Sequence, residues 1–354
     1  MKTESSKITA ALNRLKSIVG KRQTLPILSC VKIYAKNGLL NIEASNLDEH
    51  QIEQVECSGE LKPCCPDFGQ LLASIGGKDA DLSLDKTDLT IKCAYGTARL
   101  KVLDAEEFPA LPKMGKVEKI GVSGTDLAAS ISSVAWAAST DSGRWVLQSV
   151  YIAGSPKMLS CVATNGRNLA VVDLPSISAT FNIVAPSGFV GNVVAALGRD
   201  GAVLGASESH ISVEHSAGSY ACKQVDGKYP NYLGVIPKNP KLIGVAQTAD
   251  LIDALSRCNY LADPARPAAA LLKFTRAGLE IGFSGKNSNL EMLVAGEFVE
   301  HDAKMAAASL LNCLKAVKSE TVKMHCGVEG ATSMMILEAG NLFIYSTETV
   351  TQKN

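Results

Sequence analysis

The chain repeats one order of secondary-structure patterns three times along its 354 residues. In each pass, apolar residues at helical spacing come first, a run of alternating strand-like segments follows, and a second helix and further strands complete the unit. Pro109 in FPAL and Pro230 in YPNY hold matching places and lie 121 positions apart. The expected helices cover residues 8–19, 66–75, 125–138, 187–197, 249–260 and 305–317. A repeat of this length predicts one structural unit built three times.

The repeated unit excludes a parallel sheet. Its strands come in hairpin-linked runs between two helices, whereas parallel strands need a long crossover connection, usually a helix, between them. We therefore predict the α+β class, with three similar domains that each pack two helices on antiparallel sheets. The predicted domains are residues 1–117, 118–240 and 241–354.

Charge and composition limit the possible partners. The 35 basic and 35 acidic residues balance, which argues against a protein that holds nucleic acid mainly by bulk positive charge. The sequence has no run of about 18 apolar residues, and its start is an amphipathic helix pattern without a signal sequence. We therefore expect a cytoplasmic protein with no membrane segment. Its ten cysteines are scattered through apolar segments, so free thiols are expected.

Motifs for catalysis or cofactor binding are missing from the sequence. The five histidines lack the HxxxH and HExxH spacings of metal sites, and neither GxGxxG nor a Walker pattern occurs. No cofactor, metal ion or catalytic residue is predicted, and the protein is not expected to be an enzyme. One alternative is a thiol-dependent hydrolase that uses Cys64 or Cys65, which precede a predicted helix, although the sequence supplies no base for them.

Residues 162–174, VATNGRNLAVVDL, contain a strong local turn signal. Asn165-Gly166 favours a two-residue type I′ turn, because both residues tolerate the positive φ that such a turn needs. Apolar residues flank the pair on both sides. We therefore predict a hairpin between two half-buried strands.

Four segments in a fixed order carry a resemblance to a known family. They are TLPIL at 24–28, RWVLQSV at 144–150, the hairpin segment at 162–174 and VDGKYPNYLGVIP at 225–237. Together they resemble the bacterial DNA polymerase III beta subunit, the sliding clamp. The resemblance implies the DNA clamp fold, in which two chains join head to tail into a homodimeric ring with helices lining a central hole.

The resemblance also implies a function and partners. The expected function is that of a DNA replication processivity factor, which encircles duplex DNA without regard to sequence and has no catalytic activity. The expected partners are duplex DNA, a second copy of the chain, and peptides of DNA polymerases and clamp loaders. One alternative is a clamp-like binding protein that sequesters replication partners.

A DNA-facing surface is expected on the basic side of the first helix. Arg14 and Lys16 lie on that side, away from the apolar stripe. The resemblance adds Arg22, which stands where the family usually has a DNA-contacting arginine. It also adds Trp145, at a position where the family often carries an aromatic residue that can lie against DNA.

The resemblance further implies a peptide-binding pocket. Its expected residues are Leu147, Thr164, Gly166, Arg167, Leu169, Pro230, Val235 and Ser333. The apolar members of this set would form the floor, where each buried anchor side chain of a partner contributes about 1.5–3 kcal/mol. Such a pocket suits a reversible tether.

Departures from the family affect this pocket. Asn168 and Gly234 stand where the family often has arginine, which is expected to remove charge from the pocket rim. The family typically ends in a short apolar strand that forms one wall of the pocket, but here only Tyr345 and Val350 could supply apolar wall. We therefore expect weaker binding of a standard clamp-binding peptide.

Overall fold

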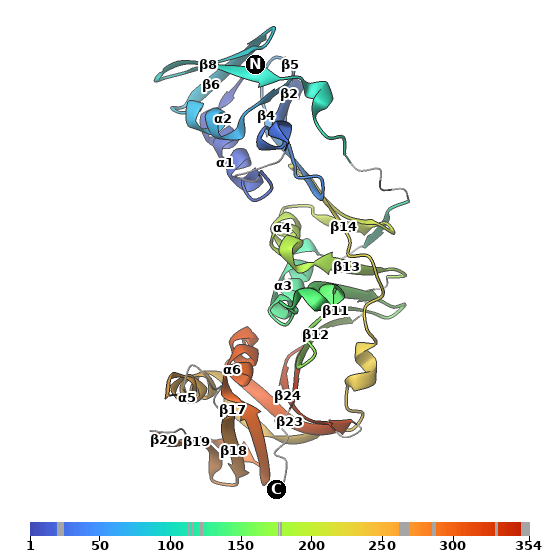
Figure 1. Ribbon diagram of the computed structural model, residues 1–354, viewed down its shortest axis with the longest axis vertical. Coiled ribbons are helices and arrows are strands. Elements are labelled where there is room, and N and C mark those ends of the chain that lie inside the picture. The colour runs from blue at the N-terminus through green and yellow to red at the C-terminus, as the bar shows by residue number, and fades with distance from the viewer. Residues whose placement is uncertain are drawn as a thin grey trace. The chain divides into compact units, whose positions relative to one another are not determined.

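The computed structural model describes residues 1–19, 25–111, 114, 116–120, 123–175, 177, 179–261, 269–284, 288–329 and 332–347 (Figure 1). Two residues of the predicted sites, Arg22 and Val350, lie outside this part of the chain. The chain divides into two compact units, one with residues 1–128 and 191–224 and one with residues 129–190 and 225–354. Two of the boundaries fall inside helices α3 (Gly124–Ala135) and α4 (Ser187–Leu197). The three domains and their boundaries stay a prediction.

The first unit is built on one antiparallel sheet of twelve strands in the order β1-β6-β7-β8-β5-β2-β3-β4-β16-β15-β14-β9. These strands are β1 (Lys2–Glu4), β2 (Lys32–Lys36), β3 (Leu39–Ser45), β4 (Glu49–Glu56), β5 (Leu61–Pro66), β6 (Asp79–Asp85), β7 (Asp88–Cys93), β8 (Gly96–Leu103), β9 (Glu118–Ile120), β14 (Val203–Ala206), β15 (His210–His215) and β16 (Gly218–Lys223). Helices α1 (Ser5–Leu15) and α2 (Phe68–Ser74) contact each other (Figure 1). Ile8, Leu12 and Leu15 form one stripe of α1 and are at most 1% exposed, so this helix packs by a single apolar face.

The second unit holds a nine-stranded sheet, β13-β10-β11-β12-β25-β24-β23-β17-β21, and a four-stranded sheet, β20-β19-β18-β22. These strands are β10 (Ser149–Gly154), β11 (Met158–Thr164), β12 (Asn168–Pro175), β13 (Asn182–Pro186), β17 (Lys241–Gln247), β18 (Ala269–Thr275), β19 (Gly278–Ser284), β20 (Asn289–Val294), β21 (Gly296–Phe298), β22 (His301–Ala306), β23 (Thr321–Glu329), β24 (Thr332–Ala339) and β25 (Leu342–Thr347). Helices α5 (Thr248–Leu261) and α6 (Ala307–Ala316) lie side by side (Figure 1). Among the described residues, no helix combines the length and the apolar character that crossing a membrane requires.

The predicted α+β class is confirmed. All strand pairs in the described residues are antiparallel, and the order helix, strands, helix, strands occurs three times. Helix α4 has the predicted bounds. Residues 290–298 do not form one continuous strand, because the chain leaves the four-stranded sheet after Val294 and pairs with β17 from Gly296 onward.

Candidate functional site

The hairpin between β11 and β12 is present, but its turn differs from the predicted type. Thr164 lies opposite Leu169, and in the loop between them only Gly166 has a positive φ, of 85°. Asn165 instead acts through its side chain, because its Oδ1 accepts hydrogen bonds from the backbone N of Arg167 at 3.0 Å and of Asn168 at 2.9 Å. This Asx arrangement replaces the type I′ geometry.

The same hairpin occurs 119 positions earlier in the chain. Ser45 lies opposite His50, and Oδ1 of Asn46 accepts from the backbone N of Asp48 at 3.1 Å and of Glu49 at 2.7 Å. Leu47 takes the place of Gly166 and also has a positive φ, of 76°. The internal repeat therefore extends to the side-chain hydrogen bonds of a single turn.

An apolar cluster surrounds Leu169, and we call it the Leu169 cluster. Its buried members are Val162, Leu169, Val171, Val184 and Tyr229, and its partly buried members are Val146, Leu147, Tyr151, Val225, Tyr232, Ile236 and Tyr345. Leu169 pairs across the sheet with Thr164 on β11 and with Tyr345 on β25. Because directly opposite residues of a sheet share a face, these strands present the cluster on one face of the nine-stranded sheet, next to the segment 225–236.

Four tyrosines give this cluster an aromatic and amphipathic lining. The rings of Tyr151 and Tyr229 stack with centroids 4.7 Å apart, and Tyr232 meets Tyr151 edge-on at 6.3 Å. Burial raises the pKa of Tyr345 to about 12, so its hydroxyl stays neutral at physiological pH. Sequence reasoning missed Tyr151, Tyr229 and Tyr232. The available signal for Tyr151 was its position directly after the segment RWVLQSV, which carries the predicted pocket residue Leu147.

The predicted pocket residues divide into those that join the cluster and those that lie outside it. Leu147 and Leu169 belong to it. In the connecting segment, Tyr229 and Ile236 contact the cluster, whereas the neighbouring Pro230 and Val235 are exposed. Pro230 and Val235 are therefore accessible beside the cluster, and their place in the pocket stays a prediction.

The remaining predicted pocket residues are polar or lie at the hairpin tip. Thr164 is half-buried, and Gly166 and Arg167 are exposed. Ser333 lies on β24, where Ile336 is opposite Tyr345. Since side chains alternate along a strand, Ser333 is directed to the face opposite Ile336 and Tyr345.

Asn168 does not lie on the rim as the sequence suggested. Its side chain is buried, and its Oδ1 accepts hydrogen bonds from Oγ of Ser309 on α6 at 3.0 Å and from Oγ of Ser346 on β25 at 2.9 Å. It therefore faces away from Leu169, its neighbour in the strand. Asn168 thus gives the sheet a buried hydrogen-bond acceptor.

The predicted DNA-facing residues of α1 have different surroundings. Arg14 donates from Nε to Oε2 of Glu53 at 2.7 Å, and Glu53 is fully buried. Arg199 approaches the same carboxylate to 3.4 Å. Lys16 directly follows α1 and is exposed. Arg14 is thus engaged inside the first unit, whereas Lys16 is accessible.

Trp145 lies in the 3₁₀ helix η3 (Ser142–Leu147) and is 51% exposed. Its ring lies so close to the backbone of Gly227 that a Cβ on Gly227 would be 2.7 Å from it. The adjacent Val146 contacts the Leu169 cluster. The structure therefore associates Trp145 with the segment that carries Tyr229.

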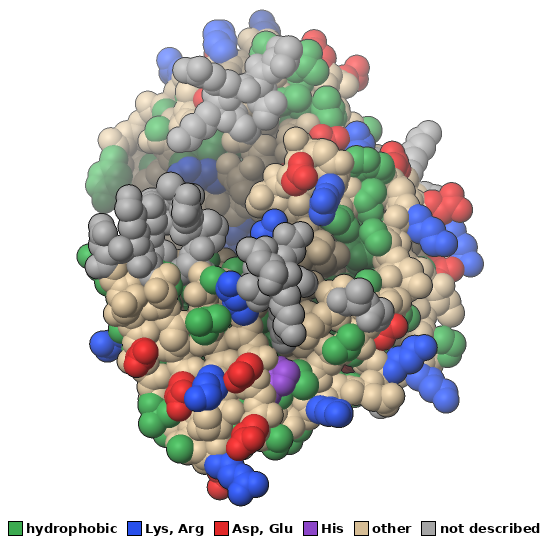
Figure 2. All heavy atoms as spheres, turned by 60° about the horizontal axis from the view of Figure 1, so that its bottom comes forward, with side chains coloured by type: hydrophobic (Ala, Val, Ile, Leu, Met, Phe, Trp, Pro, Cys, Tyr) green, Lys and Arg blue, Asp and Glu red, His purple; other side chains and the backbone are tan. Residues whose placement is uncertain are grey.

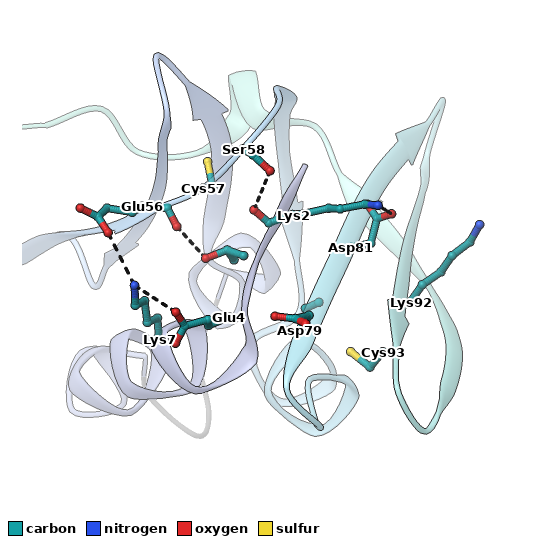
Figure 3. Close-up of a pocket in the computed structure, with 12 residues that line it drawn as sticks. Lys2, Glu4, Lys7, Glu56, Cys57, Ser58, Asp79, Asp81, Lys92 and Cys93 are labelled. Atoms are coloured by element: carbon teal, nitrogen blue, oxygen red, sulfur yellow. Dashed lines mark hydrogen bonds and ion pairs between the residues drawn. The ribbon is translucent and has the colours of Figure 1, made fainter.

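A surface pocket of about 610 Å³ in the first unit is lined mainly by charged and polar side chains (Figure 3). Lys7 points toward Glu4 and Glu56, with its Nζ 3.4 and 3.5 Å from their carboxylates. Lys2 lies 3.7 Å from Asp81. Lys2 and Lys7 are thus paired with carboxylates, and Asp79 and Lys92 also line the pocket.

The thiols proposed for a hydrolase are unsuited to that role. Cys64 and Cys65 are at most 2% exposed, and burial raises the pKa of each to about 12. Because the thiolate is the nucleophile, neither residue is reactive at neutral pH. Among the described residues, no group of His, Cys, Asp and Glu is arranged to hold a metal ion. The Leu169 cluster itself consists of apolar and aromatic groups.

Two family models match most of the first two repeats. The one described as the N-terminal domain of the DNA polymerase III beta subunit matches residues 1–112, and the one for the central domain matches residues 121–231. The chain is 27% identical to a beta sliding clamp of Caulobacter vibrioides over 257 residues, which cover 68% of this chain and 69% of that protein. It is 23% identical to a beta sliding clamp of Rickettsia felis over 347 residues, 91% of each chain.

Solved structures of sliding clamps share the fold. A clamp from Pseudomonas aeruginosa bound to griselimycin has a TM-score of 0.87 at 19% identity, covering 99% of both chains. The clamp of Bacillus subtilis has a TM-score of 0.87 at 17% identity, covering 99% of this chain and 98% of that one. The predicted clamp fold is therefore confirmed.

Proposed function

The chain belongs to the DNA polymerase III beta subunit family, the sliding clamps, and we propose that it acts as the processivity factor of a DNA polymerase. In this proposal two chains close a ring around duplex DNA, and the ring tethers the polymerase through a peptide bound at the Leu169 cluster. No catalytic step is assigned to the chain. The observation that carries the proposal is the way in which strands pair between successive repeats.

The first and second repeats each pair one strand with the last strand of the next repeat. β4 of the first repeat pairs with β16 of the second, which we call the first junction, and β12 of the second pairs with β25 of the third, the second junction. In the first junction His50 lies opposite Ala221, and in the second Leu169 lies opposite Tyr345. His50 and Leu169 both follow a four-residue hairpin loop. Ala221 and Tyr345 are both the fourth residue of a last strand. The two junctions therefore share one register.

The third repeat has the same kind of strand at a sheet edge. β20 starts at Asn289, which lies opposite Ser284 and five positions after it, as His50 and Leu169 lie five positions after their partners, and β20 forms the end of the four-stranded sheet. In the first repeat, the last strand β8 pairs with β7 from Gly96 to Lys101, while β5 reaches only Val102 and Leu103. Within the described residues, each chain thus has two strands of these kinds with an uncovered edge. One is β20, which corresponds to β4 and β12, and the other is β8, which is the last strand of its repeat like β16 and β25.

A second copy of the chain fits both edges. With the register of the two junctions, Asn289 of one chain would lie opposite Arg99 of the other. Glu291 would then be the diagonal neighbour of Arg99 on the same face, a favourable place for an opposite charge. Leu293 on β20 is 62% exposed, and in this register it would lie opposite Tyr95, which is 87% exposed. Two chains joined at both ends in this way form a closed head-to-tail ring.

The charges of the chain fit a ring that slides. On the face shown in Figure 2, acidic and basic side chains are interspersed over the surface. The formal net charge is zero, and Lys7 and Arg14 at the first helix are held by carboxylates. A groove binder would need many free cations to neutralise phosphates. A closed ring is retained by topology instead, so weak contacts suffice.

Retention on circular DNA tests the proposal. Protein loaded by a clamp loader onto nicked circular DNA should remain bound during gel filtration and should be lost once a restriction enzyme makes the DNA linear. Equal loss from circular and linear DNA would exclude a closed ring. Peptide binding without any retention on circular DNA would support the alternative of a protein that sequesters replication partners.

A further inference from the structure

Asn168 directly precedes Leu169 and is only 6% exposed. We infer that Asn168 is a positioning residue for the peptide site: it fixes the place where Leu169 meets Tyr345 and links this place to helix α6. The inference rests on the proposed function, because it concerns the strength of peptide binding at the Leu169 cluster. Asn168 itself would not touch the peptide.

Hydrogen bonds hold Asn168 through its backbone and its side chain. Its backbone N donates to Oδ1 of Asn165 at 2.9 Å, and its backbone O accepts from Oγ1 of Thr164 at 2.7 Å. Its side-chain Oδ1 accepts from the hydroxyls of Ser309 and Ser346 at 3.0 and 2.9 Å. One residue therefore joins the hairpin tip, the last strand β25 and helix α6.

The hydrogen bonds of Asn168 also fix the positions of the neighbouring residues in strands β12 and β25. Asn168 lies opposite Ser346, and the next pair along the strands is Leu169 with Tyr345. Without the Asn168 acceptor, the hydroxyl of Ser346, which is 1% exposed, would lose its partner in a buried place. An unsatisfied buried hydroxyl costs about 1–3 kcal/mol, so the strands would shift or admit water. Either response displaces Leu169 and Tyr345.

The first junction has the same construction with different chemistry. Glu49 lies 119 positions before Asn168 and is 5% exposed. Its Oε1 accepts from Nδ2 of Asn192 on α4 and from the hydroxyl of Tyr220 on β16, both at 2.6 Å. The residue after Glu49 is His50, where Leu169 stands in the second junction. Each junction thus has a buried side-chain acceptor that is hydrogen-bonded to a helix and to the last strand of the next repeat. Of the two acceptors, only Asn168 adjoins the Leu169 cluster.

Binding of a fluorescent synthetic peptide with a bacterial clamp-binding motif tests the inference. Asn168→Ala and Ser309→Ala should each raise the dissociation constant about three- to tenfold, the loss expected for one buried hydrogen bond. The double variant should bind as Asn168→Ala does, because both changes remove the same interaction. Asn168→Asp keeps the acceptor and should return the dissociation constant to within about twofold of the parent.

Asn192→Ala in the first junction is the matched control. It removes a buried hydrogen bond of the same kind and should lower the unfolding temperature without changing peptide affinity. All titrations are done well below the unfolding temperature of each variant, so that simple loss of folded protein does not enter. Affinity lost equally in the Asn192 variant would show a general effect of stability and overturn the inference.

Leu169→Asp separates failure of the inference from failure of the proposed function. Undiminished binding by this variant would show that the peptide does not bind at the Leu169 cluster. Lost binding by Leu169→Asp together with parental affinity of both Asn168→Ala and Ser309→Ala would leave the site in place and overturn only the role of Asn168. Additive effects of Asn168→Ala and Ser309→Ala would also overturn the link to α6.

Discussion

Nε of Arg14 on α1 donates a hydrogen bond of 2.7 Å to Oε2 of Glu53 on β4, a carboxylate with no exposed surface. Arg199 and Gln51 also reach this carboxylate, at 3.4 and 2.8 Å. The charge of Arg14 is thus used to bury an acid next to the first junction. Arg14 therefore stabilises the fold by pairing with Glu53, a role that its position on a basic helix face did not indicate.

Arg14→Ala should destabilise the chain by up to about 3 kcal/mol, the lower end of the range for breaking a buried ion pair. The loss stays at that end because Arg199 remains beside Glu53 and because the Arg14 side chain is 38% exposed. Lys16→Ala, on the exposed end of the same helix, should change stability by less than about 0.5 kcal/mol. Urea unfolding of the two variants measures both values.

The salt dependence of DNA binding separates the same two residues. If Arg14 is occupied by Glu53, its replacement should leave the slope of log K against log salt unchanged. Loss of a phosphate contact at Lys16 would lower that slope by about one. If Arg14→Ala lowers the slope and keeps the stability of the parent, Arg14 contacts DNA instead of stabilising Glu53.

Acid should destabilise the protein partly through Glu43. Burial alone would raise the pKa of Glu43, but His50, Lys32 and Tyr34 outweigh it and hold this pKa below its ordinary value of 4.5. A carboxyl group whose pKa is lowered by folding adds stability above its unfolded pKa, and this stability is lost as pH falls through the folded pKa. The free energy of unfolding should therefore fall as the pH drops below about 4.5.

Glu43→Gln should flatten this acid dependence, because glutamine binds no proton in either state. It should also lower stability at pH 7 by about 1–3 kcal/mol, since a buried charged partner of His50 is removed. Urea midpoints between pH 3 and pH 7 measure both effects. Glu297→Gln, an exposed change, is the control, and an equal flattening there would rule out Glu43 as the source.

The sequence predicted what local patterns and repeats encode. The order of elements, the hairpin around Asn165 and the bounds of α4 follow from periodicity and turn residues. The partner of Arg14 lies 39 residues away in the chain, and no local pattern connects a basic helix face with one particular buried glutamate. The sequence therefore predicted that this helix face is basic, but not that Arg14 on it is paired with Glu53.

The pocket stays a prediction, and the structure shows only which of its residues join the Leu169 cluster. Leu147 and Leu169 could be placed because they sit in recognisable segments. The burial of Tyr229 next to the exposed Pro230 could not be predicted, because the connecting segment has no regular alternation that assigns faces. Asn168 shows the same limit: its direction depends on Ser309, a residue 141 positions further along the chain.

Gly218→Ala should weaken the first junction. Gly218 has a φ of +141°, and a Cβ there would lie 1.9 Å from the backbone O of Ile52 on β4. Backbone strain alone costs about 1–3 kcal/mol, and the contact with Ile52 adds to it. Hydrogen exchange of the β4 amides should become faster, and the unfolding temperature should fall.

Gly188→Ala provides the matched control for this change. Gly188 lies in α4, and a Cβ there would meet no atom within 4 Å. Alanine favours a helix over glycine by up to about 1 kcal/mol, so this variant should be as stable as the parent or slightly more stable. Unchanged exchange of the β4 amides in Gly218→Ala would contradict the tight packing of the first junction.

Charge reversal across the proposed ring interface should weaken and then restore the dimer. Arg99 on β8 and Glu291 on β20 are both exposed, and the register of the two junctions makes them diagonal neighbours between two chains. Either Arg99→Glu or Glu291→Lys puts like charges together at both interfaces of the ring. At up to about 1 kcal/mol for each interface, the dissociation constant of the dimer should rise roughly tenfold or more.

The double variant Arg99→Glu, Glu291→Lys should recover most of the lost affinity, because it restores an opposite pair in the reverse order. Arg276→Glu, in the exposed turn between β18 and β19, changes charge by the same amount away from either edge and should leave the dimer unaffected. Sedimentation equilibrium at low salt measures all four proteins against the parent. If both single variants weaken the dimer and the double variant does not restore it, the interface lies near these strands but the proposed register is wrong. A parent that stays monomeric at micromolar concentration would contradict the ring itself.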